Sequence, residues 1–204
     1  MLLNFSESLD ILNKYEIPTV ESYVVENDEG LFSAMEKIPF PFVMKIDSRE
    51  IIHKTDKGGV VLGISSREEA VSRLRELLEI CDGGVIVQKQ TEGEEIIIGG
   101  KRDEVFGPVV MVGLGGIFVE IYKDIVFGLA PLNKKEALNM INSIKGKKIL
   151  EGFRGRPSVN KEALAEVLER TSNLIQNEPQ VKELDLNPVL VGENSLVCDV
   201  KILI

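Results

Sequence analysis

The chain has 204 residues, 44% of them hydrophobic and 28% charged, with a formal net charge of −9. This length allows one core of ordinary size or two small lobes, and the composition is typical of globular rather than disordered or membrane-spanning proteins. The negative charge and the lack of a dense Lys/Arg cluster exclude a general nucleic-acid-binding surface. An anion such as a nucleotide would therefore need a few basic side chains in particular places.

The N-terminal sequence turns polar and acidic too early for a secretory signal and lacks a basic beginning. The two cysteines, Cys81 and Cys198, stand far apart and have no metal-binding spacing. We therefore expect a cytoplasmic protein with two free thiols, and we expect neither a membrane nor a nucleic acid among its partners.

The first half of the chain predicts short helices and strands in alternation. Ser6 to Glu16 has the apolar spacing of an amphipathic helix, and Pro18 closes it. Ser66 to Ile80 predicts a longer helix, in which Ser66 and Glu69 have the spacing of a capping box. The remaining elements of this half are a helix at 30–38 and strands at 19–26, 41–46, 59–64 and 83–90.

The second half predicts more strands than helices. Helices are expected at 133–145 and 160–176, and the segment GEN at 192–194 has the composition of a hairpin turn. The strands are predicted at 94–102, 107–116, 117–122, 125–131, 182–191 and 195–203. The pattern is that of a mixed α and β protein, without an internal repeat or a low-complexity linker.

Lys45 lies near the end of the apolar segment 41–46. A buried lysine there needs a polar partner or the mouth of a cleft, whereas on an edge strand it could face solvent. Further on, Gly58 and Gly59 either form a hairpin turn or let backbone N–H groups approach phosphate oxygens.

The segment GLGGIFVE, Gly113 to Glu120, has three glycines in four positions directly after a predicted strand. Such a segment allows close approach of a ligand or of another chain, and it could also be a bulged hairpin. It is not a dinucleotide-binding fingerprint, because the glycine spacing differs and no helix pattern follows.

Asp185 and Asn187 alternate on one strand, so both point to the same face. Asp199 follows on the strand that the hairpin brings alongside. Amide and carboxylate oxygens from two neighbouring strands suit Mg²⁺, which takes its other ligands from water and phosphates. Asp and Asn are disfavoured within strands, although an Asn-Pro pair also often begins a turn.

His53 is the only histidine of the chain and lies in the segment IIHKTDKGGV. A loop beside two glycines is a poor place for a core histidine. An imidazole that is neutral near pH 7 can instead attack phosphorus as a nucleophile. A single histidine can equally be incidental.

Four segments in order resemble the β subunit of ADP-forming acyl-CoA synthetases such as acetate–CoA ligase. They are PFVMKIDSREIIHKTDKGGVVLGI, RDEVFGPVVMVGLGGIFVEIYKDIVFGLAPL, LEGFRGRP and ELDLNPVL, and the resemblance covers nearly the whole chain. It implies an α+β protein with the ATP-grasp fold, in which two lobes clasp a nucleotide. Residues 19–90 would form the lid lobe, and residues 1–18 with 91–204 the nucleotide- and magnesium-binding lobe.

The same resemblance implies roles for individual residues. His53 would be a phosphohistidine that carries the phosphoryl group. Asn187 and Asp199 would hold Mg²⁺. The residues expected to contact ATP or ADP are Lys45, Gly58, Gly59, Val60, Gln88, Lys89 and Glu95. Residues expected to support the site or a subunit interface are Asp185, Arg102, Gly115, Gly116 and Glu120.

The implied reaction is acyl-CoA + ADP + phosphate ⇌ acid + CoA + ATP. Thioester chemistry would belong to a partner α subunit that binds CoA, in an α2β2 assembly. That subunit would form its own phosphohistidine, and His53 would pass the phosphoryl group on to ADP. The sequence is also compatible with two other hypotheses: an ATP-grasp carboxylate ligase without a histidine carrier, and a nucleotide-binding scaffold subunit without turnover.

Overall fold

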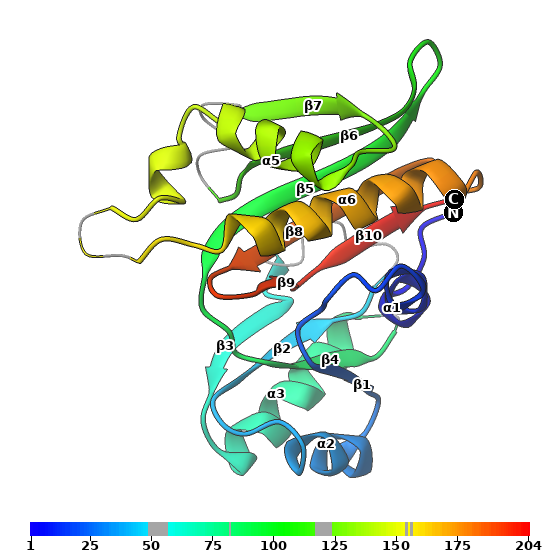
Figure 1. The fold of residues 1–204 in the computed structure, drawn as a ribbon. Coiled ribbons are helices and arrows are strands. Elements are labelled where there is room, and N and C mark those ends of the chain that lie inside the picture. The colour runs from blue at the N-terminus through cyan, green and yellow to red at the C-terminus, as the bar shows by residue number, and fades with distance from the viewer. Residues whose placement is uncertain (49–56, 82, 117–123, 154, 156) are drawn as a thin grey trace. The chain divides into compact units, whose positions relative to one another are not determined.

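The computed structural model describes residues 1–48, 57–81, 83–116, 124–153, 155 and 157–204. His53 and Glu120 lie outside these residues, as does the strand predicted at 117–122. The described chain divides into two compact units (Figure 1). The larger unit comprises residues 1–3, 7–19 and 92–204, and the smaller unit comprises residues 4–6 and 20–91.

The smaller unit is an antiparallel sheet with helices against one face. Its strand order is β1-β4-β2-β3. The elements are β1 (Ser22–Val25), α2 (Asp28–Met35), β2 (Phe42–Ile46), β3 (Val60–Ile64), α3 (Arg67–Ile80) and β4 (Val85–Lys89). Alternate residues of the strands, such as Phe42, Met44 and Val87, form a fully buried core with Leu31 of α2 and Leu74 of α3.

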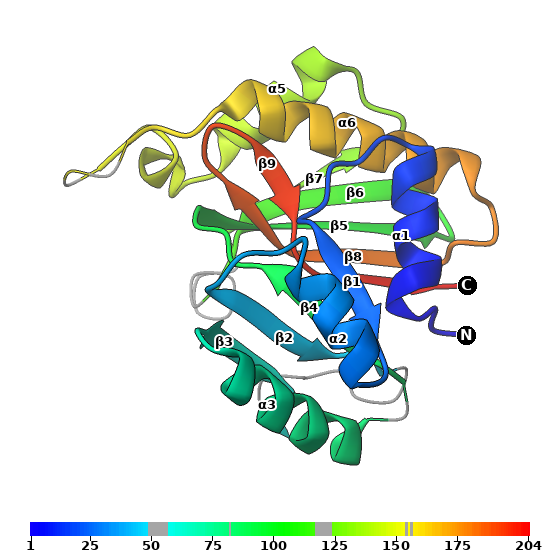
Figure 2. The same cartoon turned by 90° about the horizontal axis from the view of Figure 1, so that it is seen from below.

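The larger unit contains a sheet in the order β10-β8-β5-β6-β7, with β9 paired to β8 and every pair antiparallel (Figure 2). Its strands are β5 (Glu94–Asp103), β6 (Gly107–Leu114), β7 (Ile125–Leu129), β8 (Glu183–Val191), β9 (Ser195–Val197) and β10 (Val200–Leu203). Its helices are α5 (Lys134–Ser143), the short 3₁₀-helix η2 (Lys147–Ile149) and α6 (Lys161–Asn177). Most of α1 (Phe5–Lys14) also belongs to this unit.

Helix starts follow the local sequence closely. Ser66 caps α3 by accepting a hydrogen bond from Glu69 N at 3.2 Å. The other half of the predicted capping box is wrong, because the Glu69 carboxylate accepts from Ser65 N at 3.0 Å, one residue earlier. A complete capping box forms instead on α5, between Asn133 and Glu136.

Glu178, directly after α6, joins α1 to the end of α6 in the larger unit. Its carboxylate accepts hydrogen bonds from Lys14 Nζ at 2.5 Å, Tyr15 OH at 2.8 Å and Gln180 Nε2 at 2.5 Å. These hydrogen bonds, that from Lys14 above all, lower the pKa of Glu178 from its ordinary 4.5 to about 2. Burial, followed by the hydrogen bond to Glu178, raises the pKa of Tyr15 to about 12.

Glu178→Gln should lower the free energy of unfolding at pH 7 by about 1–3 kcal/mol, because three donors lose a charged acceptor. A group whose folded pKa is depressed stabilises the fold above its unfolded pKa, and this stability is lost as the pH falls through the folded value. The gap between wild type and variant should therefore shrink from pH 4.5 toward pH 2. Urea unfolding at several pH values measures it.

Glu166→Gln is the matched control, because Glu166 of α6 forms an exposed ion pair with Lys134 of α5. Exposed pairs contribute little, so this variant should unfold close to wild type at pH 7. Equal stability of Glu178→Gln and wild type at pH 7 would show that the Glu178 cluster does not hold α1 in place.

Candidate functional site

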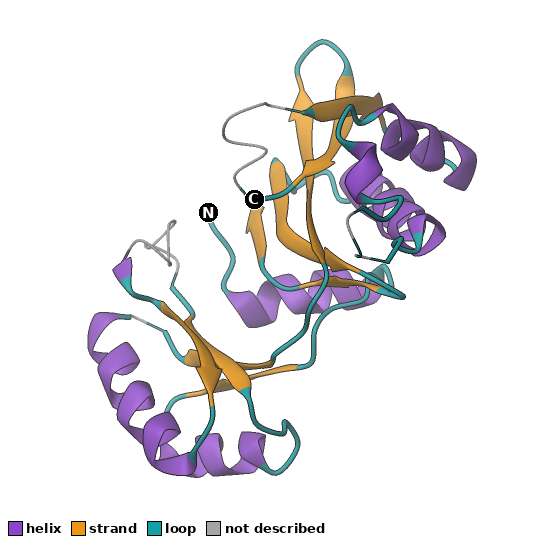
Figure 3. Ribbon diagram, turned by 90° about the vertical axis from the view of Figure 1, so that its left-hand side faces the viewer, coloured by secondary structure: helices purple, strands orange, loops and turns teal. Residues whose placement is uncertain are grey.

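Each sheet is covered by helices on one face (Figure 3). In the larger unit, a Cβ added to Gly128 of β7 would lie 2.5 Å from Met140 Sδ of α5, and one added to Gly100 of β5 would lie 3.6 Å from Ile175 of α6. The helices thus pack closely on that face. In both units the residues expected at the site lie largely on the other face of the sheet, or at its edges.

Lys45 of β2 has the polar partner that its burial requires. The Lys45 side chain points away from the core on α2 and α3, since Met44 and Ile46 occupy that core. It is only 9% exposed, and its Nζ donates a hydrogen bond to Gln88 Oε1 of β4 at 2.6 Å. The strand register allows this, because Lys45 pairs with Ile86 and Gln88 lies diagonally across from it. Lys45 and Gln88, expected together at a nucleotide, are thus in direct contact.

The glycine segment lies beside Lys45. Val60, the first residue of β3, pairs with Lys45 across the strands, and Gly59 O accepts a hydrogen bond from Ile46 N at 2.9 Å. Gly58 is exposed with a φ of +69°, which favours glycine. Gly58, Gly59 and Val60 are therefore brought to the same end of β2 as the lysine. Lys89 is exposed at the end of β4.

Asn187 and Asp199 are neighbours in the larger unit. Asn187 N donates to Asp199 O at 3.1 Å, and Cys198 N donates to Pro188 O at 2.9 Å. The single strand predicted at 195–203 is wrong, because it is interrupted between β9 and β10. Asp199 lies in this interruption, where its Oδ1 accepts from the N–H of the next residue at 3.1 Å.

The donor set around Asn187 and Asp199 fits Mg²⁺. Both side chains offer hard oxygen donors from adjacent segments. Among the described residues, no group of three or more His, Cys, Asp or Glu side chains could hold a metal by itself. A pair of this kind suits an ion that reaches the site together with the phosphates of a substrate.

Asp185 lies two residues before Asn187 and is half-buried. It stands opposite Lys201 of β10 on one side and Gly99 of β5 on the other. Burial raises the pKa of Asp185, Lys201 opposes the shift, and the charges of Asp199 and Glu183 add to it. Asp185 thus lies within the electrostatic reach of Asp199.

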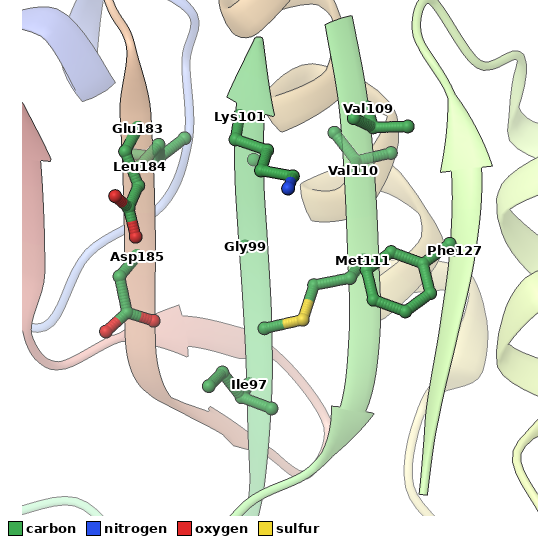
Figure 4. Close-up of a pocket in the computed structure, with 11 residues that line it drawn as sticks. Ile97, Gly99, Lys101, Val109, Val110, Met111, Phe127, Glu183, Leu184 and Asp185 are labelled. Atoms are coloured by element: carbon green, nitrogen blue, oxygen red, sulfur yellow. The ribbon is translucent and has the colours of Figure 1, made fainter. Parts of the chain in front are cut away.

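A cavity of about 290 Å³ opens beside Asp185, with β5, β6, β7 and β8 beneath it (Figure 4). A Cβ added to Gly99 would lie 2.9 Å from Met111 Cε, so the methionine side chain lies over the glycine. Phe127 of β7 lies next to Met111 of β6, and Lys101 of β5 and Glu183 of β8 also line the cavity (Figure 4). The cavity combines an apolar floor with charged edges.

Gly115 and Gly116 close around Glu95. Gly115 N donates to Glu95 O at 2.6 Å, and a Cβ added to Gly115 would lie 2.9 Å from the Glu95 backbone. Gly116 has a φ of +59°, and a Cβ there would lie 3.0 Å from Glu95 Oε2. The glycine-rich segment thus approaches a residue expected to contact the nucleotide.

Arg102 has a structural contact at the end of α6. Its guanidinium donates hydrogen bonds to Ile175 O and Gln176 O, the second at 3.2 Å. These carbonyls belong to the last turn of α6, where a cation is favoured by the helix dipole. This explains the position of Arg102 without a ligand.

Residues that the sequence patterns did not single out also lie at these places. Ser22 of β1 contacts Gln88, Lys201 faces Asp185, and Met111 covers the cavity floor. Residues two apart on a strand share a face, so the predicted strand 195–203 could have indicated that Lys201 lies on the same side as Asp199. The contact of Ser22 with Gln88 depends on the pairing of β1 with β4, which are sixty residues apart and whose partnership no local pattern reveals.

Two sheets, each carrying polar residues on the face away from its helices, suit a protein that binds a nucleotide and its metal ion. A family model described as an ATP-grasp domain matches residues 1–204, so the chain belongs to the ATP-grasp family. The α+β, ATP-grasp fold predicted from the sequence is confirmed.

Comparison with relatives defines the group of ATP-grasp proteins that this chain resembles. It is 42% identical over 200 residues to the β subunit of ADP-forming acetate–CoA ligase I of Pyrococcus furiosus, covering 94% of this chain and 86% of that one. It is 39% identical to the ADP-forming 4-hydroxybutyrate–CoA ligase of Nitrosopumilus maritimus, of which the match spans 29%. The chain thus spans most of a separate β subunit and under a third of a longer relative.

Solved structures of other proteins also resemble this chain. Acetyl-coenzyme A synthetase 1 of Ca. Korarchaeum cryptofilum, in complex with coenzyme A, Ca-AMPCP and HgCl+, matches 100% of this chain and 93% of its own with a TM-score of 0.94 and 35% identity. A phosphoribosylamine–glycine ligase of Thermotoga maritima, 16% identical with a TM-score of 0.58, shares the fold alone. No helix in the described part of the chain is long and apolar enough to cross a membrane.

Gly115→Ala should destabilise the larger unit, because its Cβ would lie 2.9 Å from the backbone of Glu95, which cannot give way easily. We expect a loss of about 1–3 kcal/mol in urea unfolding. Gly192→Ala is the matched control, since a Cβ there meets no atom within 4 Å. Equal effects of the two variants would contradict the close approach of Gly115 to Glu95.

Proposed function

We propose that this chain is the nucleotide-binding β subunit of an ADP-forming acyl-CoA synthetase. The reaction would be acyl-CoA + ADP + phosphate ⇌ acid + CoA + ATP. The observation that carries the proposal is the match, along nearly the whole chain, to β subunits of ADP-forming acetate–CoA ligases. The contact of Lys45 with Gln88 and the neighbouring Asn187 and Asp199 support it.

His53 would carry the phosphoryl group. A ring nitrogen of neutral His53 would attack phosphorus on the phosphohistidine of the partner subunit, forming one N–P bond while the partner's N–P bond breaks. A terminal oxygen of ADP would then attack the same phosphorus, forming a P–O bond and releasing neutral imidazole. A related structure of the Korarchaeum enzyme is described with a phosphorylated phosphohistidine segment, which supports this proposal.

Lys45 would lie against the nucleotide phosphates and offset their negative charge, since phosphoryl transfer depends mainly on positioning and charge neutralisation. Gly58, Gly59 and Val60 would cover these phosphates with backbone groups, and Gln88, Lys89 and Glu95 would contact the rest of the nucleotide. The smaller unit would act as a lid that excludes water from the phosphohistidine.

Asn187 and Asp199 would hold Mg²⁺. Bound there, the ion would neutralise phosphate charge and orient the phosphate oxygens. Another Korarchaeum structure is described as a complex with Mg-AMPPCP, which supports the same ion for this chain.

The partner would be an α subunit that binds CoA and handles the acid. The longer single-chain relatives, of which this chain matches 29–30%, support the need for such a partner. We propose an α2β2 assembly. A cytoplasmic location and the lack of a nucleic-acid partner stay predictions.

His53→Ala and His53→Gln should abolish ATP formation from acyl-CoA in the complex with the partner subunit, because neither side chain can form the N–P bond. Both variants should bind ADP like wild type, which shows that they are folded. Full ATP formation by either variant would contradict the carrier role.

Asp199→Asn should weaken Mg²⁺-dependent ADP binding by at least about ten-fold, because a charged oxygen ligand becomes a neutral one. Calorimetric titration with ADP, with and without Mg²⁺, measures this. Glu193→Gln, an equal charge change at an exposed position after β8, is the matched control and should bind ADP normally. An unchanged magnesium dependence in Asp199→Asn would exclude this ligand.

A further inference from the structure

A chain of hydrogen bonds runs behind Lys45 within the smaller unit. Lys45 Nζ donates to Gln88 Oε1 at 2.6 Å, and Gln88 Nε2 donates to Ser22 Oγ at 2.9 Å. Ser22 Oγ in turn donates to Val20 O at 2.7 Å. The chain crosses three strands and ends on the backbone.

The direction of every hydrogen bond in this chain is determined. An ammonium group can only donate, so the oxygen of the Gln88 amide must face Lys45. The amide nitrogen therefore faces Ser22, whose hydroxyl oxygen accepts from it. The hydroxyl hydrogen is then free to go only to the Val20 carbonyl. A backbone acceptor at one end thus fixes the orientation of the amide at the other.

The burial of Lys45 and Gln88 makes these hydrogen bonds difficult to replace. Gln88 is 2% exposed and Lys45 is 9% exposed, so water does not readily replace a lost partner. Gln88 is neutral, so its hydrogen bond to the ammonium adds no negative charge beside it. A carboxylate at the same place would form an ion pair, with which the phosphates of a ligand would compete.

The sheet does not need these side chains for its pairing. Ser22 and Gln88 already face each other in the backbone register of β1 and β4, and Val43 and Gln88 do so in that of β2 and β4. Their side chains lie on the face opposite the core formed with α2 and α3. Their hydrogen bonds are therefore available for placing the lysine.

We propose that Ser22 is a positioning residue, which acts through the Gln88 amide to fix the place of the Lys45 ammonium for the phosphates of a nucleoside diphosphate. The inference rests on the proposed function, in which Lys45 contacts those phosphates. It adds Ser22 as a determinant of nucleotide affinity that acts through Gln88 and Lys45.

The test measures ADP binding by calorimetry and thermal unfolding of the full chain. Ser22→Ala removes the acceptor for Gln88 Nε2 and should weaken ADP binding about 3- to 10-fold, the effect of one such hydrogen bond. Ser22→Thr keeps the hydroxyl in a strand that accepts β-branched residues and should restore binding. Tyr23→Phe removes the neighbouring hydroxyl, which donates a hydrogen bond to Glu21 at an exposed position, and should bind like wild type.

Gln88→Glu tests the charge. It keeps the shape of the side chain and places a negative charge on Lys45, so ADP binding should weaken by about ten-fold or more while the thermal midpoint stays near wild type. Unchanged or stronger ADP binding in this variant would overturn the inference.

Two further outcomes would also overturn it. Ser22→Ala could bind ADP like wild type, or it could lose binding together with thermal stability without restoration by Ser22→Thr. These outcomes leave the proposed function intact as long as the wild-type chain binds ADP. A wild-type chain that binds no ADP would instead contradict the proposed function itself.

Discussion

A lysine ammonium in the interior of a sheet must have an acceptor, and the site of the smaller unit depends on how Lys45 obtains one. Residues two apart on a strand share a face, so the core residues Met44 and Ile46 force Lys45 to the opposite face. There the diagonal neighbour across the strand pair is Gln88, and the hydrogen bond between them follows. The packing of α2 and α3 on one face thus leaves the other for polar chemistry.

In the larger unit, a break between two strands, rather than strand alternation, places the polar side chain of Asp199. A carboxylate in a continuous strand would have to follow the alternation of its neighbours. The break between β9 and β10 frees Asp199 from that alternation, while a backbone hydrogen bond still ties it to Asn187. Helices α5 and α6 again take one face only, which leaves Asp185 and the cavity beside Met111 on the other. Each unit therefore carries polar side chains on the face of its sheet that the helices do not cover.

Much of this was predictable from the sequence. Apolar periodicity and capping residues predicted nearly all the described helices and strands within a few residues, and the hairpin at 192–194 is confirmed. The break at Asp199 was not predicted, because SLVCDVKIL contains no glycine or proline to mark it. The Glu69 carboxylate accepts a hydrogen bond from Ser65 N rather than from Ser66 N. The sequence alone does not distinguish these two adjacent backbone donors.

The site residues also differ in how clearly the sequence indicates them. Lys45, Asn187 and Asp199 stand out because their chemistry is costly where they lie. Ser22 does not stand out, since a serine in a strand is ordinary, and only the pairing of β1 with β4 gives it a role. Arg102 was expected to support the site or a subunit interface, whereas its guanidinium contacts the end of α6.

The central claim is that this chain passes a phosphoryl group between a nucleotide and His53. Incubation of the chain with Mg²⁺ and ATP labelled on its γ-phosphate tests it most directly. The account predicts label on the protein that is lost in acid, stable in base and absent from His53→Ala. Label that persists in His53→Ala, or no label in a wild-type chain that binds ATP, would contradict it.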